Sequence, residues 1–318
     1  MPQPTVNDVH VDQLLTNLSI AYTNESYINE QIFPAVGVMK QSDIVPAYPQ
    51  SAWFRNEAAL RAPGTLPKTG GYNVDTSATY YCNQYAIGKD IPDEVRANSD
   101  QPFNPDREAT MYVTDKLMLQ REIAFATDFF TTSVWGTDKT GGTDFTVWSN
   151  YSGSSPLTDV AAYKDAVNGK IGRDPNVLVM GKQVELQLKW HPDILDVFKY
   201  TQTPLVGADK LSAVFEFPKI LIGRGIYTTD KEGTAEASVT YSRIWGKHAL
   251  MLYVPSGPSL MEPAAGYTFF WRGIPGANQV IERHRDDRAK KDVIVGYSNY
   301  DQKATATAAG LFISGAVA

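Results

Sequence analysis

The chain has 318 residues and a mass of 35.1 kDa, and 43% of its residues are hydrophobic while 20% are charged. No apolar stretch approaches the roughly 18 residues that a membrane-spanning helix needs, and such a composition can bury a sizeable core, so membrane spanning and wholesale disorder are excluded. The 29 basic and 35 acidic residues leave a net charge of −6. This charge disfavours tight non-specific binding to nucleic acid, which depends on Lys and Arg that neutralise phosphates.

The N-terminal third begins with an arm and an extended hairpin. Residues 1–45 show little helical periodicity beyond a short stretch from Val11 to Ile20, and we interpret them as an arm. Residues 46–75 contain four prolines and three glycines without an apolar repeat. Such a stretch cannot fill a core, so we predict an extended hairpin. Alternating residues from Ser77 to Ile87 then predict a strand.

Residues 104–131 give the clearest helix signal of the chain. Asn104 can cap this helix, and Pro105 suits its first position. About 27 residues at 1.5 Å each predict a length of roughly 40 Å, enough to span a domain. Apolar residues at helical spacing predict one buried face: Tyr112, Leu119, Ile123, Ala126 and Phe130.

An α/β region is predicted after this helix. Residues 136–157 are rich in Gly, Ser and Thr and indicate a boundary. A second helix is predicted from Thr158 to Gly172, and a short buried strand over 176–180. The apolar side of the second helix comprises Val160, Tyr163, Val167 and Ile171.

The rest of the chain changes from mixed to strand-like patterns. A helix over 182–200 is predicted to break at His191-Pro192, because proline disfavours helical geometry in the residue before it. A helix and a strand follow over 208–215 and 219–228. Later strands are predicted over 238–244, 249–254, 267–271, 293–297 and 303–308. The fold class is therefore α+β.

The sequence is poor in residues that carry chemistry. The single cysteine, Cys82, cannot form an intrachain disulfide, and the four histidines are too scattered for a zinc motif. No phosphate-binding loop and no Gly-x-Ser-x-Gly nucleophile elbow occur. Asp93 and Glu94 could act as paired carboxylates, but such residues in a turn are far more often solvated or salt-bridged. We expect no catalytic residue, no metal and no cofactor.

Charged and aromatic residues point to protein surfaces instead. The run Glu282–Asp292 holds five basic and four acidic residues, which favours a solvated or inter-subunit face over a nucleic-acid patch. Trp53 and Phe54 lie in a hairpin too poor in other apolar groups to bury them, and aromatic residues with arginine are typical of interfaces. The predicted inter-subunit contacts are Trp53, Phe54, Arg55, Arg61, Lys68, Tyr80 and Tyr81. The alternative, that Trp53 folds back onto its own domain, stays open.

Several segments occur in an order that is familiar from one family. They are WFRNEAALRAPGT (53–65), YAIGKDIPDEVRANSDQP (85–102), DREATMYVTDKLMLQREIAF (106–125), FFTTSVWGTD (129–138), WSNYSGSSPLTD (148–159) and the segment 172–200. In this order they resemble the major capsid proteins of tailed bacteriophages with the Hong Kong 97-type fold. The first segment is similar to that family's extended loop, the second to the entry into its long helix, and the next two to its spine helix and the exit from it.

The resemblance implies a division of the chain. The expected parts are an N-terminal arm (1–45), an extended loop (46–82), a peripheral domain with the spine helix (83–157), an axial domain (158–282) and return strands of the peripheral domain (283–318). It also implies a non-enzymatic subunit that is made in the cytoplasm of a bacterial host. Its copies would form the hexamers and pentamers of an icosahedral virion shell around double-stranded DNA.

The resemblance also implies partners. Residues 1–45 are too few for the large scaffolding segment that some relatives carry, so a separate scaffolding protein and a portal are expected, and a decoration protein is allowed. One branch of the family links a loop lysine to an asparagine of a neighbour. Lys68 lies in the loop, but no asparagine or assisting acid matches, so noncovalent cohesion is expected. The alternatives are a cellular nanocompartment shell of the same fold and a cytoplasmic α+β enzyme.

Overall fold

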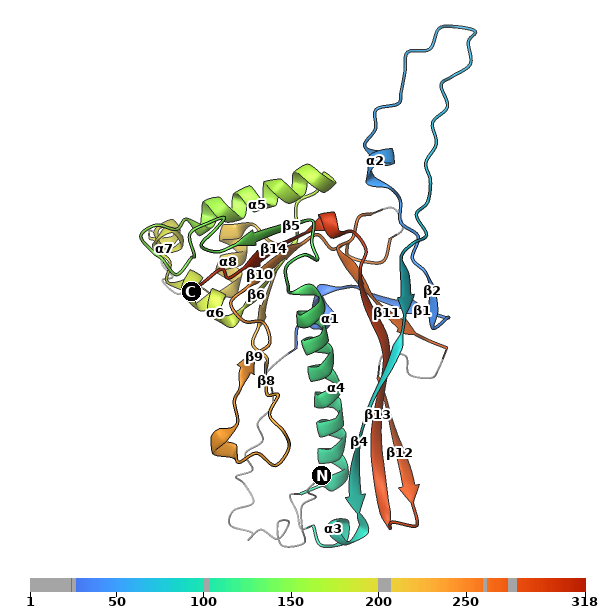
Figure 1. Cartoon of the computed structure of the whole chain (residues 1–318), viewed down its shortest axis with the longest axis vertical. Helices are drawn as coiled ribbons and strands as arrows, with labels where there is room; N and C mark the ends of the chain where they lie inside the picture. The colour runs from blue at the N-terminus through green and yellow to red at the C-terminus, as the bar shows by residue number, and fades with distance from the viewer. Residues whose placement is uncertain (1–23, 25–26, 100–102, 200–206, 260–261, 274–278) are drawn as a thin grey trace.

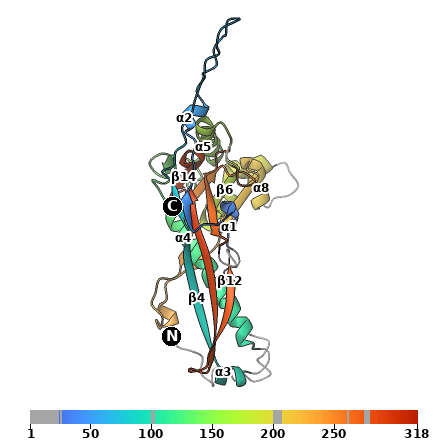
Figure 2. The ribbon, with the colours of Figure 1, turned by 90° about the vertical axis from the view of Figure 1, so that its right-hand side faces the viewer.

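The computed structural model describes residue 24 and residues 27–99, 103–199, 207–259, 262–273 and 279–318. The predicted periodic stretch from Val11 to Ile20 lies outside these residues. The molecule is elongated, with a long helix and a long sheet at one end, a helix-covered second sheet beside them, and a loop that projects from the junction (Figures 1 and 2).

The long sheet has β13 as its central strand. β13 pairs antiparallel with β4 along one edge and with β12 and then β11 along the other, and β1 pairs parallel with β11. The strands are β1 (Ala35–Val38), β4 (Asn83–Pro92), β11 (Gly266–Trp271), β12 (Val280–Asp286) and β13 (Lys291–Ala304). Short elements outside this sheet are α1 (Asn29–Ile32), β2 (Ser42–Ile44), α2 (Gln50–Trp53), β3 (Thr79–Tyr81) and α3 (Asp93–Ala97).

The predicted long helix is confirmed as α4 (Pro105–Phe129), which packs along β4 and β13. The Asn104 side chain accepts a hydrogen bond from the Arg107 backbone N–H at 3.1 Å, as a capping residue should. The helix approaches β13 closely at Gly296, where a Cβ would lie 2.4 Å from the Val113 side chain. A side chain at that position would therefore push the helix off the sheet.

The predicted buried face of this helix is wrong. Tyr112 is exposed, Leu119, Ile123 and Ala126 are only partly buried, and Phe130 is buried just beyond the helix end. The buried residues of α4 are Ala109, Val113, Leu117, Arg121, Glu122, Phe125 and Phe129. The true stripe includes two charged residues, and a search for apolar spacing passes over them and selects the neighbouring face.

These two buried charges join α4 to its surroundings. The Glu122 carboxylate accepts hydrogen bonds from the backbone N–H of Ile28 at 3.0 Å and from Trp245 Nε1 at 2.6 Å. Arg121 donates to Glu30 at 2.5 Å and to the Ser298 hydroxyl at 2.9 Å. Burial raises the pKa of Glu122, although its hydrogen bonds oppose that shift. Buried charged side chains are tolerated when hydrogen bonds satisfy them in this way.

The second sheet has the strand order β5-β14-β10-β6-β7 and carries most of the core. Its strands are β5 (Thr137–Thr140), β6 (Val177–Gly181), β7 (Lys219–Gly223), β10 (Ala249–Leu252) and β14 (Gly310–Ser314). Every residue of β6 and β10 is buried. The helices around it are α5 (Pro156–Ile171), α6 (Lys182–Lys189), α7 (Pro192–Phe198) and α8 (Ala208–Phe215), as Figure 1 shows. Outside the sheet lie β8 (Ile226–Tyr227), β9 (Ser242–Arg243) and the 3-10 turns Glu236–Ser238 and Thr307–Ala309.

Most predictions for this region are confirmed. The predicted apolar side of α5 is buried, and Gly172 ends the helix with a left-handed φ of 68°. The break at His191-Pro192 separates α6 from α7. The segment 136–157 is not merely a boundary, because it contains strand β5 and the buried side chain of Trp148.

Strand pairing disagrees with part of the predicted division. Strand β14, expected among the peripheral return strands of 283–318, pairs with β5 and β10 in the second sheet. Strands β11 and β12, expected in the axial segment 158–282 except for the end of β12, pair with β13 in the long sheet. The chain crosses between the sheets several times, and a strand pattern does not tell which sheet a strand joins. Of the predicted strand 238–244 only β9 forms, while β12 was missed because its charged residues conceal a strand.

Candidate assembly interface

The extended loop (46–82) projects from the junction of the two sheets, as both views show (Figures 1 and 2). Its two arms are joined near the root by the backbone pair Ala47–Asp75, with N···O distances of 2.9 and 2.8 Å. At the tip, the Thr65 N–H donates to the Ala62 carbonyl at 3.2 Å, and Gly64 has a φ of 80°. Proline followed by a positive-φ glycine makes a type II turn. The local sequence therefore fixes the shape of the tip.

The extended loop displays much of the apolar surface of the molecule. Leu60 and Leu66, which flank the turn, are 104% and 93% exposed. Of the eighteen large apolar residues that are exposed in the described part of the chain, seven lie within the extended loop: Trp53, Phe54, Leu60, Leu66, Tyr72, Val74 and Tyr81. Concentrated apolar exposure of this kind marks an interaction surface.

An aromatic cluster forms at the root of the loop. The Trp53 ring lies 6.2 Å from the Tyr48 ring and 5.6 Å from the Tyr72 ring, measured between centroids. Phe54 rests against Gly172 at the end of α5, and the Gln50 side chain donates to the Lys170 carbonyl. Trp53 nevertheless stays 53% exposed. One part of the Trp53 ring packs against its own loop, and the rest of the ring is exposed to solvent.

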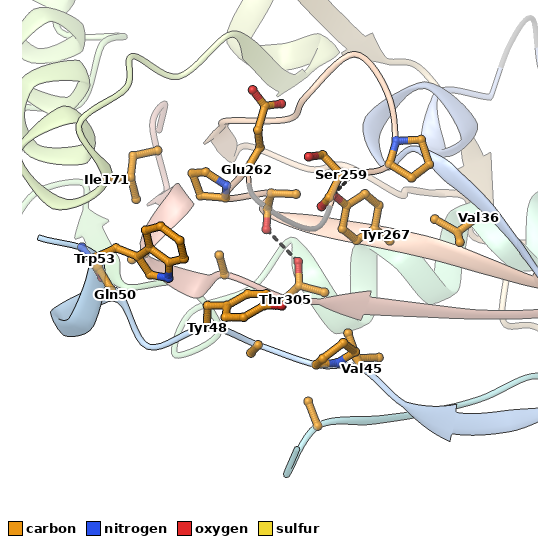
Figure 3. Close-up of a pocket in the computed structure, with 18 of the residues that line it drawn as sticks. Val36, Val45, Tyr48, Gln50, Trp53, Ile171, Ser259, Glu262, Tyr267 and Thr305 are labelled. Carbon is orange, nitrogen blue, oxygen red and sulfur yellow. Dashed lines mark hydrogen bonds between the residues drawn. The ribbon is translucent and has the colours of Figure 1, made fainter. Parts of the chain in front are cut away.

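A pocket of about 710 Å³ lies between this root and the body (Figure 3). Trp53 and Tyr48 form its loop side, Val45 lies just before the loop, and Ile171 and Tyr267 belong to its body side. Several polar groups in its wall bond to one another or to the backbone. The Thr305 hydroxyl donates to the Ala264 carbonyl at 2.7 Å, Tyr267 donates to the Ser259 carbonyl at 3.2 Å, and Arg173 pairs with Glu262 at 3.0 Å. The pocket therefore offers mainly apolar contact.

The structure separates the predicted contact residues into two groups. Trp53, Phe54, Arg55, Arg61, Lys68 and Tyr81 are exposed. Tyr80 is only 6% exposed and stacks on Phe269 with centroids 4.7 Å apart, so its prediction as a surface contact is wrong. Tyr80 and Tyr81 are neighbours in a strand, where successive side chains point to opposite faces.

Sequence reasoning missed other members of this surface. Leu60 and Leu66 bracket the sequence Ala62-Pro63-Gly64-Thr65, a turn signal, and apolar residues beside such a turn could have been recognised as exposed. Tyr48 and Tyr72 lie far apart in sequence on opposite arms, with ring centroids 5.7 Å apart. Their proximity depends on the pairing of the arms, which no local pattern predicts.

The charged run Glu282–Asp292 occupies the opposite end of the molecule, in β12 and its turn into β13. Its charges are largely neutralised within the subunit. Arg285 donates to Asp93 at 2.5 Å, and Arg96 pairs with Asp292 at 2.6 Å. Hydrogen bonding from Arg283 lowers the pKa of Asp292 to about 2. A face that is paired in this way has little positive charge left for phosphates.

Two kinds of feature are absent from the part of the chain that the structure describes. No cluster of three or more His, Cys, Asp or Glu side chains there could hold a metal ion. Likewise, none of the described helices has the length and apolar character to cross a bilayer.

No protein-family model matches the sequence. The major capsid protein of Burkholderia phage BcepMu is 28% identical to the chain over 281 residues, which cover 86% of this chain and 87% of that protein. The chain is a Hong Kong 97-type major capsid protein. It is a structural, non-enzymatic component of the icosahedral shell of a tailed phage and is located in the virion. The alternative of a cytoplasmic enzyme is thereby overturned.

Solved structures agree with this capsid fold. A phage-related protein of Bordetella bronchiseptica RB50 has a TM-score of 0.70 at 22% identity, covering 96% of this chain and 97% of that one. The capsid structure of cyanophage P-SCSP1u has a TM-score of 0.59 at 12% identity, covering 98% and 95%. The encapsulin of Synechococcus elongatus PCC 7942 has a TM-score of 0.52 at 8% identity, covering 96% and 95%. The predicted α+β capsid fold is confirmed, and the long helix α4 is the spine helix that the resemblance implied.

Proposed function

We propose that copies of this capsid protein assemble into hexamers and pentamers that close around the double-stranded DNA of the phage. The observation that carries this proposal is the extended loop with its exposed apolar residues. An isolated subunit would expose this surface to water at a cost that scales with its area. Neighbouring copies can cover it, and several modest contacts per subunit add up to strong retention in a closed lattice.

The exposed members of the predicted contact set support this role. Trp53 and Phe54 supply aromatic surface of the kind that dominates interface energies. Arg55 is tied to Glu57 at 3.1 Å, and Arg61 donates to the Thr65 carbonyl at 2.5 Å. These internal bonds stiffen the loop, so less entropy is lost when a neighbour binds. We include Lys68 and Tyr81 in the interface and leave out Tyr80.

We keep the proposed division into arm, extended loop, peripheral domain and axial domain, with β5 and β14 moved to the axial side and β11 and β12 moved to the peripheral side. We also propose a separate scaffolding protein and a portal as partners, and a decoration protein as a further one. The acidic balance of the subunit fits a container for DNA, since a net charge of −6 does not attract DNA to the wall.

The rival proposal of a nanocompartment shell rests on fold alone. The encapsulin likeness has 8% identity, and a shared fold does not fix the contents of the shell. The phage capsid relative, at 28% identity over most of both chains, favours the viral shell.

Electron microscopy of particles from cells that express the chain with its neighbouring phage genes tests the proposal. We expect angular shells with hexameric and pentameric capsomers that contain DNA. Small DNA-free shells that hold an enzyme would favour the rival proposal, and a chain that stays monomeric under all these conditions would contradict assembly altogether.

A further inference from the structure

We infer that the pocket at the loop root of one subunit receives the loop tip of a neighbouring subunit. This inference rests on the proposed function, because it requires identical copies side by side. It names the receiving surface for the apolar residues of the tip.

The pocket has the size and chemistry of a receptor for apolar side chains. Its volume of about 710 Å³ is far larger than the roughly 30 Å³ that a single water occupies in the liquid. It lies within the range of pockets that enclose whole ligands. The hydroxyls of Thr305 and Tyr267 and the Arg173–Glu262 pair already have partners within the wall. A guest therefore needs to bring apolar surface rather than hydrogen bonds.

The loop tip has the matching character. Leu60 and Leu66 are fully exposed on either side of the turn, and Arg61 is folded onto the Thr65 carbonyl. The two leucines are thus the apolar groups that the tip presents. Because the turn fixes the backbone between them, they are offered together in one conformation.

Charge favours the same pairing. Residues 55–68 contain three basic side chains and one acidic side chain, which gives this segment a net charge of +2. Because the whole chain has a net charge of −6, the remaining residues together carry a net charge of −8. A basic tip is attracted to the acidic body of another copy, and this attraction orients the two before the apolar contact forms.

The arrangement suits a ring of identical subunits. The nine residue steps from Phe54 to Pro63 reach about 30 Å when extended, and the loop points away from its own body (Figures 1 and 2). The tip therefore does not return to its own root. A contact that joins one patch on a subunit to a different patch on an identical neighbour is heterologous. When the rotation that relates neighbouring subunits closes after a full turn, such contacts form a ring. Each copy then gives one tip and receives one. The root of the receiving subunit's own loop forms one wall of the pocket. A loop tip that enters the pocket therefore also stabilises the position of the receiving subunit's loop.

Cysteine crosslinking between two single variants tests this contact. Ala62→Cys places a thiol at the tip without removing either leucine, and Ala78→Cys places one in the pocket wall. The native Cys82 does not interfere, because it is buried and burial raises its pKa to about 11. The two variants are coassembled and treated with a short bismaleimide. We expect covalent dimers that join one Ala62→Cys chain to one Ala78→Cys chain, identified by the linked peptides.

The matched control replaces the pocket thiol with Ala86→Cys. Ala86 pairs with Tyr297 in the long sheet, next to Gly296, whose position faces α4. Because successive residues of a strand point to opposite faces, Ala86 lies on the face away from α4, which we take as the competing surface for the tip. The inference would be overturned if Ala62→Cys formed dimers with Ala86→Cys but not with Ala78→Cys. It would also be overturned if well-formed particles gave no dimers with either variant. Both outcomes would leave the proposed function intact. If the unmodified chain forms no particles, the proposed function and this inference both fail.

A second measurement removes the apolar guest. Leu60→Ser with Leu66→Ser should lower particle yield at least tenfold at equal subunit concentration, with the melting temperature of the subunit unchanged. Ala58→Ser with Ala59→Ser, on the same arm, should leave the yield within twofold. Equal yields for the two double variants would contradict a role for the leucines.

Discussion

The second sheet and the extended loop use the same kinds of residue for opposite purposes. In β6 and β10 every side chain is buried within the subunit, and the large core cluster grows around them. In the extended loop most of the large apolar residues are exposed, and Leu60 and Leu66 lie almost entirely in solvent. Apolar residues therefore stabilise the fold in one region and the assembly in the other. Substitutions in the two regions should change different measured quantities.

The largest effect on folding is expected at the buried stripe of α4. Phe125 is fully buried and packs against Phe33 and Trp245 with centroid distances of 5.0 and 5.8 Å. Phe125→Ala should lower the free energy of unfolding by about 3–5 kcal/mol, because it removes apolar contacts and leaves a cavity. Urea unfolding followed by tryptophan fluorescence measures the change.

The control for this stripe is the exposed Tyr112 on the same helix. Tyr112→Ala should change the free energy of unfolding by less than about 0.5 kcal/mol. Equal losses for the two variants would mean that the helix packs through a different face. The sequence predicted that Ile123 lies on the buried face of the helix, but Ile123 is only partly buried. Ile123→Asp should therefore be tolerated better than Phe125→Asp.

The largest effect on assembly is expected at the loop root. Trp53→Ala with Phe54→Ala should leave the melting temperature of the subunit within about 2 °C of the original value. Particle yield at equal concentration should fall by at least about 30-fold, the equivalent of the roughly 2 kcal/mol that one strong interface residue contributes. Sedimentation separates particles from free subunits. A normal yield, or a large loss of subunit stability, would assign these aromatic residues to the fold instead.

The two regions also differ in how far the sequence predicts them. The second sheet and its helices follow local rules: Gly172 stops α5, His191-Pro192 breaks the next helix, and a continuous apolar run makes β6. The long sheet is less predictable, because β12 consists mostly of charged residues. Their partners, such as Asp93, lie far away in the sequence. For the loop, its extension and the exposed aromatic residues were predictable. The pocket was not, since its wall joins residues from the loop, α5 and β11.

Acid should weaken the body more than the loop. His191 Nδ1 accepts a hydrogen bond from the Asp193 N–H at 3.2 Å, and His248 Nδ1 accepts one from the Gly315 N–H at 3.0 Å. A protonated imidazole can only donate, so protonation would break both bonds. Burial lowers the pKa of both side chains, although the Asp193 charge partly opposes this for His191.

The sign of the pH effect follows from these lowered values. The neutral forms are favoured in the folded state, whereas in the unfolded chain histidine titrates near about 6.5. The stabilisation is therefore complete above about pH 6.5 and is lost as the pH falls towards the folded pKa values. The melting temperature of the subunit should fall between about pH 7.5 and pH 5. His248→Gln should reduce this fall and His284→Gln, at an exposed position, should not. A melting temperature that does not change over this range would contradict the assignment.

The smallest effect is expected at the tip of the loop, and it separates the two regions most cleanly. Gly64 has a φ of 80°, and the space around it is open, so Gly64→Ala meets no steric clash and is strained only in its backbone. That strain should amount to about 1 kcal/mol and should reshape the turn that holds Leu60 and Leu66. Because the tip contacts no part of the core, the melting temperature of the subunit should not change, while particle assembly should slow a few-fold as the leucines lose their common orientation. Light scattering follows the rate, and Gly71→Ala, on the same loop without a positive φ, is the matched control. A drop in subunit stability, or equal assembly rates for the two variants, would show that the tip does not act as a preformed contact.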